Sequence, residues 1–145
     1  VLGILYKIDY NQMIFRLENI KRPASRQRIL EIKNSIIIDD SFNSNLKGAL
    51  KALEQLKHYN KKKIIITPGF VECKKLLPNL YLKYAKKINE ICDYAYIVKL
   101  STSKILYDLI EINHSYVRSV DEVRPMLSFN NEAILIENDV PDIYL

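Results

Sequence analysis

Apolar positions along the chain follow two different periods, which alternate from about residue 27 onward. Continuous apolar runs, typical of strands covered on both faces, occupy residues 36–38, 64–66, 94–98 and 133–136. Between these runs, apolar residues recur at helical spacing in residues 46–56, 81–91 and 105–110. Strands that alternate with helices through short connections predict a mostly parallel sheet with helices packed on it.

Two shorter features complete the predicted fold. Residues 27–33 form a further strand candidate, and the short turn at Lys33-Asn34 predicts an antiparallel hairpin with residues 35–38. Ser119 and Glu122 have the spacing of a capping box for a short helix, preceded by a short strand at Tyr116-Val117. The expected fold class is therefore α/β: a Rossmann-like three-layer sandwich whose sheet is mostly parallel, with one antiparallel edge hairpin.

The first residues predict a separate helix. Asp9 and Gln12 match a capping box, and Pro23 is expected to end the helix. One apolar stripe along it consists of Met13, Ile14, Leu17 and Ile20. The chain also begins without Met, which suggests a segment of a longer protein. We expect residues 1–24 to be the helical tail of a preceding domain or a linker, and residues 25–145 to form one domain.

Composition narrows the function classes. The net charge is +5, but the basic residues are scattered and their one tight run is Lys61-Lys62-Lys63, so a solvated basic surface is favoured over nucleic-acid binding. No apolar run approaches the ~18 residues that a membrane-spanning helix needs. Cys73 and Cys92 form no C-x-x-C pair and the two His residues lie far apart, so no metal site is expected. These features favour a reducing, cytoplasmic compartment.

Candidate chemistry follows from the predicted sheet. Ligands of parallel α/β sheets bind beyond the carboxyl ends of the strands, so the loops of interest begin at Asp39, Thr67, Lys99 and Glu137. The carboxylates of the polar turn at residues 39–45 are suited to hydrogen-bond ribose hydroxyls or to hold a cation. The alternative is that Asp39, Asp40 and Asn45 only cap the next helix.

Two further acidic positions follow strands. Glu72 lies just past the strand at residues 64–66, where it is either a site residue or an exposed loop acid. Glu137-Asn138-Asp139 follows the last strand, and its alternative is an acidic C-terminal turn. The chain has only three glycines and neither a G-x-x-x-x-G-K-[ST] nor a G-x-G-x-x-G phosphate-binding loop. By itself it is expected to show no ATPase activity and weak nucleotide affinity.

Residues 38–45 (I-D-D-S-F-N-S-N) resemble the D-D-S-Y-N-x-N signature that opens the C-terminal domain of Mur ligases, the MurF-like type most closely. Ser25-Arg26 stands where that family has a G-R or H-R pair. Residues 67–72 (T-P-G-F-V-E) resemble the family's G-D-M-x-E segment, and residues 133–142 resemble an E-N-D-L-P-D ending. The helix at residues 12–20 resembles the last helix of the family's central ATPase domain.

The resemblance implies a function in peptidoglycan precursor synthesis. Such ligases use ATP and Mg²⁺ to phosphorylate a substrate carboxylate, which an amine then attacks to form an amide. The C-terminal domain closes over the nucleotide and helps to bind the amine, here a D-Ala-D-Ala-like substrate that is joined to a UDP-muramoyl-peptide. Carried onto this sequence, Arg26 and Asp40 contact the ribose or fix the interdomain hinge, Asn43 and Asn45 lie near the nucleotide, and Glu72 faces the amine.

The resemblance implies a monomer in which the phosphate loop and the Mg²⁺ ligands belong to a preceding central ATPase domain of the same chain. Three departures from the family pattern concern the amine substrate: Phe42 replaces the usual Tyr, Gly69 the Asp of G-D-M, and residues 137–139 the common K-G-S. They leave open a ligase of the same superfamily with another substrate, such as a folylpolyglutamate-synthase-like enzyme. A third alternative is a non-catalytic Rossmann-like binding module.

Overall fold

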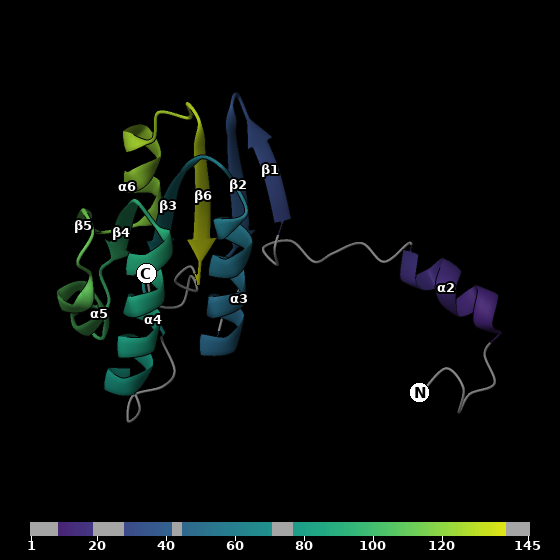
Figure 1. Ribbon diagram of the computed structural model, residues 1–145, viewed down its shortest axis with the longest axis horizontal. Coiled ribbons are helices and arrows are strands. Elements are labelled where there is room, and N and C mark those ends of the chain that lie inside the picture. Colours follow the sequence, from purple (N-terminus) through teal and green to yellow (C-terminus); the bar gives the residue numbers. More distant parts are fainter. Residues whose placement is uncertain (1–8, 19–27, 42–44, 71–76, 139–145) are drawn as a thin grey trace.

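The computed structural model describes residues 9–18, 28–41, 45–70 and 77–138. Within these ranges, one six-stranded sheet has the order β1-β2-β6-β3-β4-β5 (Figure 1). Its strands are β1 (Arg28–Ile32), β2 (Ser35–Asp40), β3 (Lys62–Thr67), β4 (Tyr94–Val98), β5 (His114–Val117) and β6 (Glu132–Glu137). Every apolar run that predicted a strand lies in this sheet.

The strand directions confirm the predicted topology. β1 pairs antiparallel with β2 through the turn at Lys33-Asn34, and the other neighbouring strands pair in parallel. Lys33 closes the hairpin with a left-handed backbone at φ 54°. The central strands β2, β6 and β3 place Ile37, Ile134 and Ile64 on one face of the sheet and Ile38, Leu135 and Ile65 on the other.

The two faces are covered unequally, which gives the three layers. α3 (Leu46–Lys57), α4 (Leu77–Ile91) and α5 (Ser103–Leu109) pack on the face of Ile38 and Leu135, and α3 lies beside α4. α6 (Val120–Val123) covers the other face, where Val123 is fully buried, and the short 3₁₀ helix η1 (Arg124–Met126) follows it in the chain. The Ser119 hydroxyl accepts from the Glu122 amide as predicted, while the Glu122 carboxylate accepts from the amide of Arg118 rather than that of Ser119.

The predicted N-terminal helix is α2 (Tyr10–Glu18). Asp9 caps it, because its Oδ1 atom accepts hydrogen bonds from the amides of Asn11 and Gln12. Tyr10 and Phe15 are 70% and 67% exposed on this helix. Pro23, the predicted end of the helix, lies outside the described residues. Among the helices that the structure describes, none has the length and apolarity to cross a membrane.

Candidate functional site at the carboxyl edge of the sheet

The carboxyl ends of three neighbouring strands meet at one edge of the sheet, toward which the β6 arrow points in Figure 1. Asp40 of β2 stands opposite Glu137 of β6, and Thr67 ends the adjacent strand β3. Because side chains alternate between faces along a strand, Glu137 shares the face of Leu135, and Thr67 shares that of Ile65. Both side chains therefore project toward α3 and α4. This edge, which we call the carboxyl edge, is where the sequence predicted a ligand-binding rim.

The two aspartates of the D-D-S turn differ in their surroundings. The Oδ1 atom of Asp39 accepts hydrogen bonds from the Ser41 amide at 3.2 Å and from the Ser41 hydroxyl at 2.6 Å. This local turn takes up one oxygen of the Asp39 carboxylate. Asp40 is the last residue of β2 and is half-buried at the carboxyl edge. The predicted position of Asp40 on the edge of the sheet is thus confirmed, whereas its contact with a ribose stays a prediction.

Asn45 is a helix cap, which was the structural alternative for this residue. Its Oδ1 atom accepts from the amide of Gly48 at 3.0 Å and so satisfies one free donor in the first turn of α3. The Asn45 side chain is exposed, so the cap leaves it at the surface. Three other predicted site residues, Arg26, Asn43 and Glu72, lie outside the described residues.

A buried hydrogen-bond network, which we call the Glu137 network, joins β6, β3 and α4. The Oε2 atom of Glu137 accepts from the Tyr84 hydroxyl at 2.8 Å and from the Thr67 hydroxyl at 3.0 Å. All three residues are fully buried. The sequence left open whether Glu137 is a site residue after the last strand or part of an acidic C-terminal turn, and the structure shows it as the buried last residue of β6. The phase of β6 turns this carboxylate inward, and two hydroxyl donors compensate part of its desolvation.

Burial has a clear electrostatic effect on the phenol of this network. Loss of solvation raises the pKa of Tyr84 well above its ordinary value, and the negative charge of Glu137 raises it further. The phenol therefore stays protonated and remains a hydrogen-bond donor at physiological pH. The Tyr84 hydroxyl therefore donates into the buried Glu137 side chain, and the Glu137 network ties the end of β6 to β3 and α4.

The loop after β3 is held by Thr67, which also belongs to the Glu137 network, and by Tyr81. Gly69 has φ 80°, and its amide donates to the Thr67 hydroxyl at 3.0 Å. A Cβ atom on Gly69 would lie 2.5 Å from the Tyr81 hydroxyl oxygen, so both the backbone and the available space require glycine. The Tyr81 hydroxyl accepts from the Phe70 amide at 3.0 Å and donates to the Phe70 carbonyl at 3.3 Å. The segment that leads toward Glu72 thus begins from a fixed, buried turn.

Asn138 links the loops after β6 and β3 to the end of β2. Its amide donates to the Asp40 carbonyl at 3.3 Å, and its side-chain Nδ2 atom donates to the Gly69 carbonyl. Asn138 is 1% exposed and has a left-handed backbone at φ 56°. Asn tolerates this conformation better than most residues. Like Glu137, it is buried.

The sequence pattern did not reveal the roles of the two tyrosines. Tyr81 and Tyr84 were assigned to the apolar face of a helix, and their rings do pack in the core against Phe70, at centroid distances of 5.7 and 5.0 Å. Their hydroxyls, however, organise the polar loops at the carboxyl edge. The available signal was the period of the last strand, which puts Glu137 on the same face as Leu135 and hence toward an adjacent helix.

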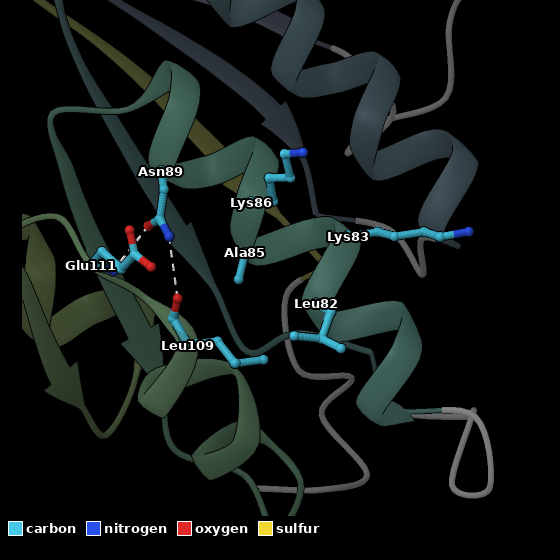
Figure 2. A pocket seen from close by; sticks show the side chains of 7 residues that line it. All are labelled: Leu82, Lys83, Ala85, Lys86, Asn89, Leu109 and Glu111. Atoms are coloured by element: carbon cyan, nitrogen blue, oxygen red, sulfur yellow. Dashed lines mark hydrogen bonds between the residues drawn. The ribbon is translucent and has the colours of Figure 1, made fainter.

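A groove of about 450 Å³ on the helical layer is a second candidate site (Figure 2). Leu82 and Leu109 face each other across it, whereas Lys83 and Lys86 project away from Leu109. Asn89 is engaged there, donating to the Leu109 carbonyl at 3.2 Å and accepting from the Glu111 amide at 3.0 Å. The groove is lined by residues of α4, the last residue of α5 and Glu111, and not by the ends of β2, β3 or β6, so it is separate from the candidate site.

The thiol that the structure describes is not a candidate nucleophile. Cys92 is 5% exposed, and burial, assisted by the charge of Asp93, raises its pKa to about 12. A protonated, inaccessible thiol is unreactive. Cys73 lies outside the described residues. No group of three or more potential metal ligands occurs among the residues described.

Comparison with known proteins shows a shared fold at low sequence identity. The chain resembles MurF ligase from Thermotoga maritima, solved in complex with ADP, with a TM-score of 0.72 and 16% identity over 87% of this chain and 30% of that one. MurF from Acinetobacter baumannii matches with a TM-score of 0.76 and 14% identity over 95% and 32%. Folylpolyglutamate synthase from Thermotoga maritima matches with a TM-score of 0.57 and 16% identity over 90% and 31%.

These likenesses establish the fold, which is that of a Mur ligase C-terminal domain. The chain spans about a third of the length of the solved ligases that it matches. No protein-family model matches the sequence, and no curated protein matches it at a significant level.

Proposed function

We propose that this chain is the C-terminal domain of an ATP-dependent, ADP-forming amide-bond ligase of peptidoglycan precursor synthesis in the cytoplasm. One observation supports this function above the others: the D-D-S turn lies at the carboxyl edge of the sheet, with Asp40 half-buried as the last residue of β2. Parallel sheets bind nucleotides at this edge. The shared fold with ligases such as MurF supports the same proposal.

In the proposed site, Arg26 and Asp40 contact the ribose of ATP or fix the interdomain hinge, and Asn43 and Asn45 lie near the nucleotide. The residues of this edge favour contact with a sugar over a triphosphate, because Asp40 places a half-buried carboxylate there, while neither β3 nor β6 is followed in sequence by a glycine-rich loop. When bound, ATP would activate a carboxylate for attack by an amine. The phosphate-binding and Mg²⁺-binding residues would belong to a preceding ATPase domain.

The proposed partner of this domain in cis agrees with the surface of α2. An isolated amphipathic helix of nine residues is marginal in water, yet Tyr10 and Phe15 of α2 expose most of their rings. We propose that residues 1–24 pack against the preceding ATPase domain and residues 25–145 form the domain that closes over the nucleotide. The remaining substrates are then a UDP-muramoyl-peptide and a D-Ala-D-Ala-like amine, which Glu72 helps to bind.

The test uses the full-length protein that contains this chain. ADP release is measured with ATP, UDP-muramoyl-tripeptide and D-Ala-D-Ala, and the amide product is identified by mass. We expect Asp40→Ala and Arg26→Ala each to raise the KM for ATP by about tenfold, the effect of losing one charge-assisted hydrogen bond. Asp93→Ala, at the opposite edge of the sheet, is the matched carboxylate control and should keep the wild-type KM. Unchanged kinetics in both the Asp40 and the Arg26 variants would reject the nucleotide roles.

The same superfamily with another amine substrate is a second candidate, and the Glu137 network favours it. Where the Mur pattern has K-G-S, the strand end here turns a carboxylate into the core, and Gly69 stands where the pattern has an acid. The amine therefore meets neither the K-G-S residues at the strand end nor the acid at position 69 that the Mur pattern predicts. A panel of acceptor amines, including D-Ala-D-Ala, other dipeptides and glutamate with a folate, separates the candidates by which acceptor increases ADP release.

A further inference from the structure

The strand β6 has a left-handed asparagine at each end. Asn131 precedes it with φ 61° and Asn138 follows it with φ 56°. Asn131 is exposed at the amino end, where its Oδ1 atom accepts from the Lys61 ammonium at 3.3 Å. Asn138 is buried at the carboxyl end and bonds to the carbonyls of Asp40 and Gly69. The two residues share a backbone conformation, so their difference lies in what their side chains hold.

The two hydrogen bonds of Asn138 join the end of β6 to the end of β2 and to the turn after β3, which are distant from it in sequence. Its backbone amide donates to the carbonyl of Asp40 at the end of β2. Its side-chain amide reaches across to Gly69, in the buried turn after β3. That turn is itself fixed by Thr67 and Tyr81. Movement of the Asp40 carbonyl relative to β3 therefore requires that a buried hydrogen bond is broken, which is unfavourable where water cannot replace it.

We infer that Asn138 is a positioning residue for Asp40, which rests on the proposed nucleotide-binding function of that aspartate. By holding the Asp40 carbonyl, Asn138 limits rotation of the peptide that follows β2. The Cα–Cβ direction of Asp40 is set by the same backbone. The side-chain bond to Gly69 keeps Asn138 itself in place. The result is a carboxylate whose direction is fixed before the nucleotide arrives, which reduces the ordering cost of binding.

The test compares three variants in the full-length protein. Asn138→Gly keeps the left-handed backbone and the amide that bonds Asp40, but removes the bond to Gly69. Asn138→Asp keeps the size and conformation while replacing the donor with a carboxylate. Asn131→Gly makes the same substitution at the other end of β6 and is the matched control. Thermal melting of each variant first establishes that it is folded.

Steady-state ADP release with ATP, UDP-muramoyl-tripeptide and D-Ala-D-Ala gives the kinetic readout. We expect Asn138→Gly and Asn138→Asp to raise the KM for ATP by about fivefold, as for the loss of one buried hydrogen bond. The KM for D-Ala-D-Ala should change less, and Asn131→Gly should keep both wild-type values. A wild-type KM for ATP in both Asn138 variants would overturn the inference, even if they melt at a lower temperature.

Amide hydrogen exchange separates this inference from the proposed function. In the same full-length variants, exchange at residues 39–41 should be faster for Asn138→Gly than for wild type and Asn131→Gly. Unchanged exchange there would overturn the structural coupling whatever the kinetics. Faster exchange in a protein whose wild type releases no ADP with any acceptor would instead reject the proposed ligase function and leave the coupling between Asn138 and the end of β2 established.

Discussion

β6 has a buried glutamate at each end, and the two are held by different parts of the chain. At the amino end, Glu132 accepts from the Ser128 hydroxyl at 2.9 Å and the Phe129 amide at 2.8 Å, both within four residues. At the carboxyl end, Glu137 accepts from Thr67 and Tyr84, which are 70 and 53 residues away in sequence. The Glu132 carboxylate is thus held by a local turn, although the backbone amide of Glu132 donates to the Ser35 hydroxyl of β2, whereas the Glu137 carboxylate depends on two distant elements.

The long-range hydrogen bonds of Glu137 lie at the carboxyl edge, where the candidate site is, and the local ones of Glu132 lie at the opposite edge. The bonds of the Glu132 carboxylate close within one loop, so their loss should disturb the rest of the sheet little. The long-range bonds of Glu137 instead hold β6, β3 and α4 together at the edge where ligands of parallel sheets bind. A binding edge made of several loops needs such cross-connections, because each loop alone has few contacts that fix it.

The largest expected effect is the loss of the Glu137 carboxylate. Glu137→Ala leaves the hydroxyls of Tyr84 and Thr67 buried without this acceptor, so we expect unfolding free energy to fall by about 3 kcal/mol. Glu132→Ala should cost only about 1 kcal/mol, because Ser128 is exposed and Phe129 half-buried, so that water can replace the carboxylate. Urea unfolding of the 145-residue chain measures both. Equal losses would contradict the contrast between the two ends.

A smaller effect, with a distinct pH dependence, is expected for the phenol of the same network. Tyr84→Phe removes one bond to a charged acceptor and should cost about 2 kcal/mol near pH 7. Because the pKa of Tyr84 is raised in the folded protein, mainly by burial, its contribution is complete below the unfolded pKa near 10. Above that pH the unfolded chain releases the proton first, so the stabilisation declines as pH rises toward the folded pKa.

The wild-type and Tyr84→Phe unfolding curves should therefore converge above pH 10, by up to about 1.4 kcal/mol per pH unit. Cys92 and Tyr96 also have raised pKa values, but both proteins retain them, so their effects cancel in the difference. Urea titrations from pH 7 to about pH 11 give the two curves. A constant gap across this range would show that Tyr84 ionises as easily in the folded protein as in the unfolded chain.

The sequence predicted the helices and strands better than the hydrogen bonds between their side chains. Continuous apolar runs such as residues 64–66 and 133–136 are buried on both faces only in the centre of a parallel sheet. Periodicity alone therefore predicted the strands and the carboxyl edge. Asn45 has two compatible roles at the start of α3: the structure shows the helix cap through its bond to Gly48, while its place near a nucleotide stays a prediction. Local chemistry limits the choices at such a position without deciding among them.

The Glu137 network could not be predicted in full, because hydrophobic periodicity describes faces and not atoms. Tyr84 satisfies the apolar stripe of α4 with its ring, and the stripe contains no information on where the hydroxyl points. The order β2-β6-β3, which brings Glu137 beside Thr67, inserts the last strand between two earlier ones and has no local signature. A polar residue in phase with the buried positions of a strand is the one signal that the sequence did contain.

The smallest expected effect on stability comes from loss of the Lys61 side chain at the amino edge of the sheet. The Lys61 ammonium donates to the Asn34 carbonyl at 2.8 Å and lies 3.3 Å from the Asn131 side chain, which links the hairpin turn to the residue before β6. This link parallels the one that Asn138 makes at the carboxyl edge, but Asn34 and Asn131 are exposed. Lys61→Met should therefore lower the unfolding free energy by only about 0.5 kcal/mol, since water replaces the lost donor.

Urea unfolding of the Lys61→Met and Glu137→Ala variants compares the loss of unfolding free energy at the amino edge of the sheet with the loss at the carboxyl edge. A Lys61→Met loss close to that of Glu137→Ala would mean that links between loops matter equally at both edges, and the burial of the partners would no longer explain the difference. The expected result is a sheet whose amino edge tolerates substitution and whose carboxyl edge does not. That asymmetry is what a domain needs if one edge must hold its side chains ready for a ligand.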